Sequence, residues 1–453
     1  MSKIETDKVR EIAGQPEKYF QDYQLTVEKV DKSGAVYHGK PVPFLYVPKI
    51  FTSQDICRFG KAMQELFKIV DHTIDLYMKH ASIRALFGFD KRLEELILST
   101  ANGHGYRVNV PMGRFDIFYY QDGGYKFCEL NTDGTSAMNE EVELTAVLLS
   151  SLPMCEVARD HTVKNFELFD SWVEEVNNIY NEYRVSNHKI PLDCSRREAY
   201  ENTTVAILDF KDKGNLLEFD IFKKHFEKAG FRCVIADPRD LMYNDGRLFY
   251  EGQEIDIIYR RLVTKDLMDR YDEIPALIQG LLANKTCVIG PIKSQIIHTK
   301  RFFEVLYQST FRKFLSEEEI AYIDEHVPMT KLLENNEDLN VYLATKDNYI
   351  VKPIDNYAST GVCAGKDYTQ EEWESLLWEK MREHYIIQEY CPLALSENVL
   401  YGQDGKAELY NFHNLTGLYV YNQKFSGIYS RASRNAIISA RHNSYTMSSV
   451  YVE

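Results

Sequence analysis

The sequence predicts a mixed protein that combines α+β and α/β organisation and begins with a mainly helical region. Three observations predict this class. Residues 53–77 carry apolar side chains at helical spacing, residues 114–130 form two strand-like runs joined by an Asp-Gly turn, and residues 205–289 alternate between strand-like and helix-like runs. Such alternation is typical of a parallel sheet with crossover helices.

Composition excludes several classes of protein. The chain has 453 residues, enough for about three domain-sized units. Its 53 Lys and Arg against 68 Asp and Glu give a net charge of −15, which argues against nucleic-acid binding because such binding needs a basic surface. Hydrophobic residues make up 44% of the chain, so disorder and low complexity are excluded for most of it.

The sequence also predicts the compartment of the protein. Residues 1–20 have neither an apolar core nor a small-residue cleavage site, so we expect no secretory signal. No window approaches about 18 uninterrupted apolar residues, so we expect no membrane span. The eight cysteines are scattered without a Cys-x-x-Cys pair and are interpreted as reduced thiols, not as disulfides or zinc ligands. Together these features predict a cytoplasmic protein.

The first half of the chain reads as helix, hairpin and helices. Thr52 or Ser53 is suited to cap the helix predicted over residues 53–77. The predicted hairpin has strands at 114–120 and 125–130. Helical spacing returns at 138–149 and 165–183, and the polar stretch 184–202 predicts a boundary between two units.

The second half predicts a parallel sheet followed by a second α+β unit. Strands are expected at 205–210, 233–236, 255–259 and 286–289, with helices at 216–229 and 267–282. The later elements are expected as helices at 292–307, 316–324 and 369–381, a surface connection at 332–338, and strands at 349–353, 361–364, 385–390 and onward to 431.

The predicted hairpin carries a candidate metal site. Side chains alternate along a strand, so Arg114 and Asp116 share one face of the first strand, while Glu129 and Asn131 share one face of the second. In register, two carboxylates and an amide oxygen would converge, and these are hard oxygen ligands that suit Mg²⁺ when nucleotide phosphates complete its shell. The alternative interpretation is a solvated sheet face on which Arg114 pairs with an acid.

Two later segments carry residues suited to a nucleotide. Lys352 ends an apolar strand and precedes a small, polar loop that can present backbone N–H groups to phosphates. The Walker P-loop pattern is absent. A further apolar strand ends in Gln388, Glu389 and Tyr390, whose backbone is suited to bind an adenine edge. Taken singly, each segment also fits an ordinary strand end.

In the order strand with lysine, helix, and strand ending in Gln-Glu, these segments resemble the ATP-grasp architecture. The acidic strands precede the lysine, and that order is similar to the glutathionylspermidine synthase-like group, which has a circularly permuted ATP-grasp. In that group a hairpin of the form Arg-Phe-Asp followed by Glu-x-Asn-x-Asp supplies the Mg²⁺ ligands. The resemblance extends from about residue 114 to the C-terminus.

The resemblance implies ATP and Mg²⁺ as cofactors and a role for each matching residue. Arg114 corresponds to an arginine that contacts phosphate, and Arg431 to one that contacts the reacting phosphoryl group. The implied metal ligands are Asp116, Glu129 and Asn131. The implied ATP-binding residues, besides Arg114, are Lys300, Lys352 and the adenine linker formed by Gln388, Glu389, Tyr390 and Cys391.

The resemblance also implies four regions. These are a mainly helical region at 1–110, the metal-binding hairpin with helices of the ATP-grasp core at 111–200, a parallel-sheet substrate domain like a pre-ATP-grasp domain at 201–295, and the nucleotide-binding subdomains at 296–453. Two departures stand out. The loop 354–361 contains a single glycine where relatives have more, and we expect only a synthetase-like unit, without an amidase domain.

Substrate contacts are predicted at Thr135, Ser136, Arg260 and Arg261, because arginine forks match carboxylates. For the two arginines the alternative is a solvated or salt-bridged structural role. The implied activity is an ATP-dependent carboxylate-amine ligase acting on small molecules through an acylphosphate, with no nucleic-acid or membrane partner. Two other functions stay open: a nucleotide-binding module without ligase activity, and an ATP-dependent phosphotransferase. The sequence does not indicate an oligomeric state.

Overall fold

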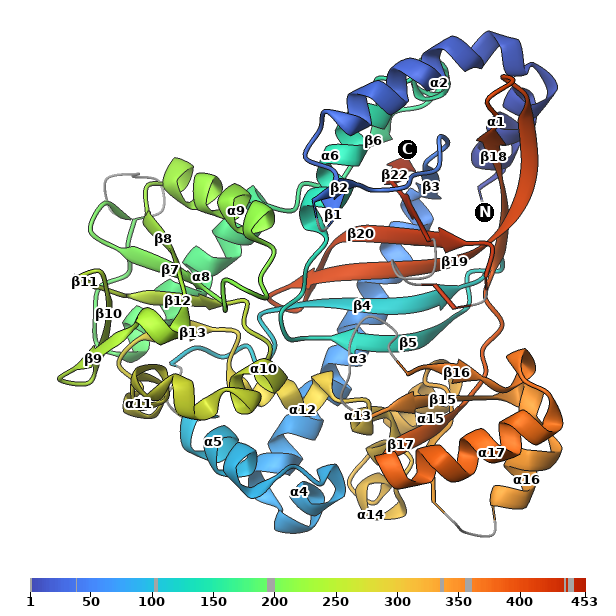
Figure 1. The fold of residues 1–453 in the computed structure, drawn as a ribbon. Coiled ribbons are helices and arrows are strands. Elements are labelled where there is room, and N and C mark those ends of the chain that lie inside the picture. Colours follow the sequence, from blue (N-terminus) through green and yellow to red (C-terminus); the bar gives the residue numbers. More distant parts are fainter. Residues whose placement is uncertain are drawn as a thin grey trace.

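The computed structural model describes residues 2–37, 39–101, 105–193, 200–334, 338–354, 361–435, 437–438 and 444–453. At its centre is a six-stranded antiparallel sheet with the strand order β21-β20-β19-β4-β5, in which β18 also pairs with β19 (Figure 1). Its strands come from two distant parts of the chain: β4 (Met112–Tyr119), β5 (Tyr125–Asn131), β18 (Leu395–Tyr401), β19 (Ala407–Tyr421), β20 (Lys424–Ser433) and β21 (Tyr445–Met447). The predicted hairpin is therefore the edge of a larger sheet.

One face of the central sheet is covered by the long helix α3 (Ser53–Lys79), which passes behind it in Figure 1. Thr52 caps this helix in a capping box with Asp55, and its first turn is fixed in this way. The apolar stripe of α3 packs in one core with Phe115 and Ile117 of β4. The alternate side chains of β4 consequently point to the opposite face of the sheet.

The remaining elements of the first 160 residues lie in separate places around this sheet: the first two helices are at the top of Figure 1 near β18, whereas residues 81–101 are at its lower left. Strand β22 (Ser449–Val452) lies between β3 (Lys49–Thr52) and β6 (Val163–Lys164), so a C-terminal segment is held against an N-terminal one. The other elements of this region are α1 (Lys3–Gly14), α2 (Pro16–Asp31), β1 (Val36–Tyr37), β2 (Lys40–Pro41), α4 (Ala81–Phe87), α5 (Lys91–Ala101), α6 (Met138–Leu148) and α7 (Leu152–Asp160).

A four-stranded parallel sheet of order β13-β12-β7-β8 forms a second unit, drawn in green and yellow in Figure 1. This confirms the parallel sheet expected from the alternation. Its strands are β7 (Thr204–Leu208), β8 (Arg232–Ala236), β12 (Ile257–Arg260) and β13 (Cys287–Ile289), accompanied by α8 (Asp170–Ser186), α9 (Leu216–Ala229), α10 (Thr264–Asp269), η3 (Tyr271–Glu273) and α11 (Pro275–Ala283).

The third unit is an antiparallel sheet of order β14-β17-β15-β16, drawn in orange at the lower right of Figure 1. Its strands are β14 (Thr330–Leu332), β15 (Tyr349–Pro353), β16 (Cys363–Ala364) and β17 (Tyr385–Glu389), with α16 (Leu339–Ala344), η5 (Lys346–Asn348), η6 (Gly365–Asp367), α17 (Gln370–Lys380) and η7 (Met381–Glu383). Trp373 and Leu377 of α17 pack on Val351 and Ile387 of this sheet in a core of its own.

The mixed fold class that the sequence predicts is confirmed, with local corrections. The helix expected at 267–282 is two helices, since Pro275 starts a new one and cannot donate within a continuing helix. The helix expected at 292–307 is broken into η4 (Ile292–Ser294), α12 (Gln295–His298) and α13 (Arg301–Val305), because Thr299 is extended. α14 (Ser309–Arg312) and α15 (Glu317–His326) follow.

Two further corrections concern residues outside the predicted elements. A three-stranded sheet formed by β9 (Met242–Asn244), β10 (Arg247–Tyr250) and β11 (Gln253–Glu254), preceded by η2 (Pro238–Asp240), was not expected from the sequence. β14 (Thr330–Leu332) was not expected, and its last residue, Leu332, is the first of the expected surface connection 332–338. Residues 335–337 of that connection lie outside the described residues, as do 355–360 of the loop with one glycine.

Among the described residues, all seven cysteines carry free thiols, and no helix combines the length and apolar character that a bilayer span requires. Cys194 lies outside the described residues.

Candidate functional site

The predicted metal-site residues are brought together by the register of the hairpin. Asp116 of β4 lies directly opposite Glu129 of β5, and Arg114 lies opposite Asn131. The register then shifts, because Ile117 pairs with Phe127 and Cys128 is left as an extra residue in β5. A bulge of this kind changes which face the following residues present. It allows Phe127 to be buried in the core against α3 while Glu129, two residues later, points to the opposite face.

Two arginines from different strands share the carboxylate of Asp116. Arg114 donates from Nε to Oδ1 at 2.8 Å and from Nη2 to Oδ2 at 3.3 Å, and Arg431 of β20 donates to Oδ2 at 2.7 Å. Asp116 is fully buried. Arg114 also donates to the backbone oxygen of Ser136 at 3.1 Å, which fixes this predicted substrate residue beside the cluster.

The two arginines also share an aromatic neighbour, Tyr429, and lie on either side of a glycine in the sheet. The guanidinium carbons of Arg114 and Arg431 lie 5.4 and 5.9 Å from the ring centre of Tyr429. Between them runs β19, where Gly417 pairs with Asp116 on one side and with Tyr429 on the other. A Cβ atom at Gly417 would lie 2.7 Å from Oδ1 of Asp116 and 2.8 Å from Cδ of Arg114. The missing side chain is what lets the cluster lie across the sheet.

Glu129 is held in its ionised form by nearby cations. Burial alone would raise the pKa of its carboxyl, but Lys300, Arg431, a hydrogen bond from Asn131 and Lys352 outweigh burial and lower the pKa to about 2. Asn131 donates from Nδ2 to Oε1 of Glu129 at 3.2 Å. An ionised carboxylate beside an amide is a donor set that fits Mg²⁺.

Lys352 joins the third sheet to the central one. Its ammonium donates to Oε1 of Gln388 at 2.7 Å within the third sheet and to the backbone oxygen of Cys128, the bulge residue of β5, at 3.4 Å. Gln388 in turn donates to Oγ1 of Thr330 at 2.8 Å, and this bond orients its amide. The lysine is 6% exposed, so its charge is directed into the space between the two sheets.

That space is a cavity whose walls come from both sheets. Lys300, Lys352, Glu129 and Arg431 supply its charged groups. Its other lining residues are Phe118, Cys128, Ile350, Val362, Gln388, Glu389, Tyr390, Cys391, Leu393, Leu415, Ile437 and Ile438. Lys300 lies at the break between α12 and α13, where its N–H donates to the backbone oxygen of Ile354 at 3.1 Å. Arg114 and Asp116 do not line this cavity.

The linker that follows β17 is fixed by backbone bonds. The N–H of Glu389 donates to the backbone oxygen of Met329 at 2.9 Å, and that of Tyr390 donates to Asn348 at 2.8 Å. Burial raises the pKa of the Cys391 thiol to about 12, so this cysteine is a neutral apolar wall residue.

The predicted substrate residues lie around a second, smaller cavity. Thr135, Arg260 and Arg261 line it, together with Tyr259 and Trp172. Both arginines are paired with buried acids, Arg260 with Asp133 at 2.6 Å and Arg261 with Glu218 at 2.6 Å. Ser136 contributes its backbone oxygen to Arg114 and to the Tyr419 hydroxyl, and it does not line this cavity.

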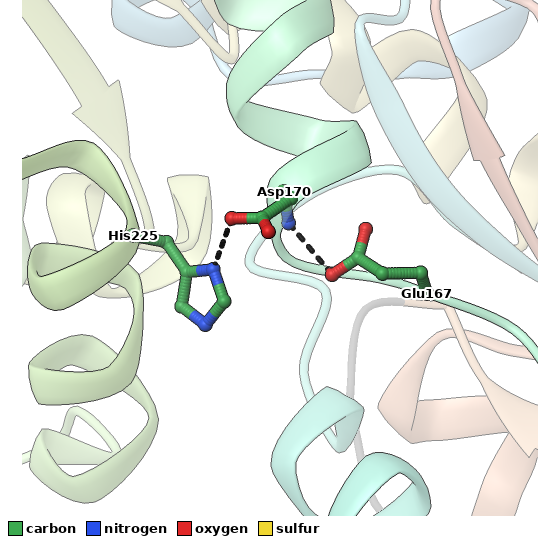
Figure 2. A group of neighbouring side chains, drawn as sticks. All are labelled: Glu167, Asp170 and His225. Carbon is green, nitrogen blue, oxygen red and sulfur yellow. Dashed lines mark hydrogen bonds and ion pairs between the residues drawn. The ribbon is translucent and has the colours of Figure 1, made fainter. Parts of the chain in front are cut away.

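A group of acids and a histidine lies apart from these cavities (Figure 2). Glu167, Asp170 and His225 approach one another closely enough to suggest a metal site. However, Glu167 accepts the backbone N–H groups of residues 169, 170 and 171 at the start of α8, and Asp170 is bound by His225 and by the ammonium of Lys228 at 2.6 Å. These acids cap a helix and pair with cations, which explains why α8 begins at Asp170 and not at residue 165.

Comparison with known proteins places this geometry in a known fold. No protein-family model matches the sequence. A glutathione synthetase-like effector of Globodera pallida superposes with a TM-score of 0.58 at 12% identity, covering 96% of this chain and 97% of the other. An ATP-grasp enzyme of Aspergillus thermomutatus, ankG, is 23% identical over 240 residues, which is 48% of each chain. The protein therefore spans about half the length of this curated relative.

The chain has an ATP-grasp fold. The ATP-grasp architecture predicted from the sequence is thereby confirmed. The predicted roles of individual residues are not tested by these similarities and stay predictions.

Several residues that line the cavity or contact the arginine cluster beside it were not predicted from the sequence. Phe118 was recoverable, since it shares a strand face with Asp116. Cys128 was not, because a bulge changes the alternation. Tyr429, Gly417 and Leu415 carry no local signal, since their importance comes only from their pairing beside Asp116 and Arg431.

Proposed function

We propose that the protein is an ATP-dependent carboxylate-amine ligase that forms an amide bond through an acylphosphate. The observation that carries the proposal is the cavity between the central sheet and the β14-β17-β15-β16 sheet that Lys300, Lys352, Glu129 and Arg431 line. It gathers two lysines, an arginine, an ionised glutamate and the 388–391 linker from five separate parts of the sequence.

The cavity combines apolar and charged lining residues, as an adenine nucleotide requires. The adenine is assigned to the linker, where Ile350 and Leu415 supply apolar walls and the backbone after β17 supplies hydrogen bonds. The phosphates are assigned to Lys300, Lys352 and Arg431, whose charges offset theirs. Glu129 and Asn131 would hold Mg²⁺, which when bound neutralises phosphate charge.

The reaction proposed for this site consists of two transfers. In the first, a carboxylate oxygen of the substrate attacks the γ-phosphorus of ATP, the bond from that phosphorus to the bridging oxygen breaks, and ADP leaves. In the second, the uncharged amine attacks the acyl carbon, the bond to the phosphate oxygen breaks, and the nitrogen loses a proton. The chain supplies positioning and charge stabilisation, and it needs no covalent nucleophile.

The finer assignment, a glutathionylspermidine synthase-like ligase, draws on the motif order and on the second cavity. That cavity adjoins the central sheet at residues 132–135 and the carboxyl ends of β12 and β13. Ligands of open parallel sheets bind at such strand ends. Because Arg260 and Arg261 are already paired with acids, a substrate carboxylate there would have to share them.

Nucleotide binding is tested first by thermal unfolding with and without Mg²⁺ and a non-hydrolysable ATP analogue. A ligand that binds the folded state raises the Tm, by an amount set by its concentration relative to Kd. We expect a Mg²⁺-dependent rise in the wild type that is lost in Lys352→Ala. Lys68→Ala, which removes a lysine exposed on α3, is the matched control and should retain the rise. If the Tm does not rise at millimolar nucleotide, the ligase is no longer the best-supported function.

Product analysis then separates the ligase from the two other functions. Incubation with Mg²⁺-ATP and mixtures of small carboxylic acids and amines should release ADP and phosphate and yield an amide by mass spectrometry. A phosphate ester in place of the amide would identify a phosphotransferase. Nucleotide binding without single-turnover formation of ADP would indicate a binding module.

A further inference from the structure

Asp116 occupies an unusual position for a metal ligand. Its side chain is 1% exposed, and it does not line the cavity, whereas Glu129 and Arg431 do. Oδ2 accepts from both arginines, at 2.7 Å from Arg431 and 3.3 Å from Arg114, and Oδ1 accepts from Arg114 at 2.8 Å. Both oxygens are therefore engaged by guanidinium groups.

The hydrogen-bonding capacity of the carboxylate is nearly filled by these contacts. Two carboxylate oxygens offer about four lone-pair positions, and the two arginines use three of them. The remaining position is on Oδ1, which lies over Gly417 of β19, so close that a Cβ atom there would be 2.7 Å away. A metal ion with its water shell has no open approach from that side.

The two arginines, by contrast, need the carboxylate. They come from β4 and β20, with β19 between them, and both stack near the ring of Tyr429. Two guanidinium groups at such closeness repel each other unless an anion lies between them, and a buried charge left unpaired is costly. Asp116 is that anion. Arg114 lies behind it and Arg431 in front, at the cavity wall.

We propose that Asp116 is a positioning residue: it is the counter-ion that holds Arg114 and Arg431 together and directs Arg431 into the cavity, while metal binding falls to Glu129. The proposal rests on the proposed function for the identity of the ligand that Arg431 meets. It differs from the role that the family resemblance implies for Asp116, and it concerns the protein without nucleotide as well as with it.

The first test uses the ligand-free protein in the presence of a chelator. Thermal unfolding is measured for Asp116→Asn, Arg431→Leu and the double variant. If Asp116 is the counter-ion, Asp116→Asn lowers the Tm by several degrees, and the loss is smaller when Arg431 is already Leu, because the bond to Arg431 is then gone and only the bonds from Arg114 remain to be lost. Lys352 does not contact Asp116. In the same cycle with Lys352→Met in place of Arg431→Leu, the Tm losses of the two single variants should therefore add up to that of the double variant. Additivity in the Arg431 cycle would overturn the proposal.

The second test is the Mg²⁺ dependence of binding of a non-hydrolysable ATP analogue. Asp116→Asn should leave the Mg²⁺ midpoint within about twofold of the wild type, whereas Glu129→Gln should raise it about tenfold or more, as loss of a metal ligand does. Asp116→Asn should weaken binding of the analogue but not of adenosine, which has no phosphate to meet Arg431. A merely structural defect would weaken both.

The outcomes of the two tests distinguish the counter-ion role of Asp116 from metal ligation. Equal shifts of the Mg²⁺ midpoint in Asp116→Asn and Glu129→Gln would overturn the counter-ion role in favour of metal ligation. Weakened adenosine binding in Asp116→Asn would overturn the positioning role. If the wild type binds no nucleotide, the proposed function fails, and the ligand-free cycle alone decides whether Asp116 couples the two arginines.

Discussion

At the scale of single residues, the absence of a side chain is as important as any charged group. Gly417 lies in the middle of β19, where a glycine weakens a strand because it has no side chain to pack. Here its position is filled by Arg114 and the carboxylate of Asp116. The arginine cluster and the strand glycine are therefore one structural unit, and a change at either should disturb the other.

Gly417→Ala tests this dependence. The added methyl group would lie within 3 Å of Asp116 and Arg114, closer than side-chain carbons approach in folded proteins, so the carboxylate must move. We expect nucleotide affinity to fall about tenfold or more and unfolding to become easier by about 1–3 kcal/mol, the usual cost of overpacking. Both are measured by titration with the ATP analogue and by thermal unfolding.

Gly60→Ala is the matched control for that change. Gly60 is in α3, and an added Cβ atom would meet nothing within 4 Å. The substitution should therefore leave nucleotide affinity unchanged and stabilise the helix by about 0.5–1 kcal/mol. Equal losses of affinity in the two variants would show that the position of Gly417 is not special.

At the scale of elements, the sequence predicted those helices and strands that carry a local signal. The Asp122-Gly123 turn and the two apolar runs were enough to place the β4–β5 hairpin, and the Thr52 cap was enough to start α3. Strict alternation, however, puts Phe127 and Glu129 on the same face, while the structure puts one in the core and the other at the cavity. The two residues face opposite ways because Cys128 is an extra residue between them, and nothing in the composition of the strand marks such a bulge.

Contacts between distant strands were beyond prediction for a different reason. Asp116 and Arg431 are far apart in sequence, and their meeting depends on β19 lying between β4 and β20. The resemblance suggested that both residues belong to one site, but it did not indicate that they pair. The break at Thr299 likewise accompanies a backbone bond to another unit, from Lys300 to Ile354, whereas the break at Pro275 follows from a local signal, the proline itself.

Helix α6 gives a pH dependence to stability. Burial raises the pKa of Glu141 from 4.5 to about 8, although Ser449 donates to it at 2.7 Å and Thr145 at 3.0 Å. A carboxyl whose folded pKa is raised stabilises the fold fully below its unfolded value and loses this contribution as pH rises toward the folded value. The free energy of unfolding should therefore fall by about 1.4 kcal/mol for each pH unit between about pH 5 and pH 8, because of Glu141 alone.

Glu141→Gln should remove this slope. The glutamine oxygen can accept the same two hydrogen bonds, and the amide carries no charge to bury. The Tm of the variant should equal that of the wild type near pH 5 and exceed it increasingly toward pH 8. Glu174→Gln makes the same chemical change at an exposed position of α8 and serves as the control. A constant difference between the Glu141→Gln variant and the wild type at all pH values would show that Glu141 is not buried as a neutral acid.

At the scale of the whole molecule, the cavity depends on two sheets staying together. Direct contacts between them include the bond from Lys352 to the bulge residue Cys128, while the segment after β15 is tied to the α12–α13 break through Ile354 and Lys300. The third sheet otherwise has its own core around Trp373. A nucleotide that contacts both walls would add bonds across this junction and restrain the two sheets relative to each other.

Amide hydrogen exchange measures that restraint directly. With Mg²⁺ and the ATP analogue, exchange should slow in β15, β17 and the 389–391 linker, and in β5 around the bulge, because opening of these strands would first require release of the ligand. Strands β7 and β8 of the parallel sheet do not line the cavity and should exchange as before. Adenosine, which lacks the phosphates that meet Lys300, Lys352 and Arg431, should protect the linker alone. Protection confined to the parallel sheet would place the nucleotide at the strand ends of β12 and β13, and the cavity between the two antiparallel sheets would then serve another ligand.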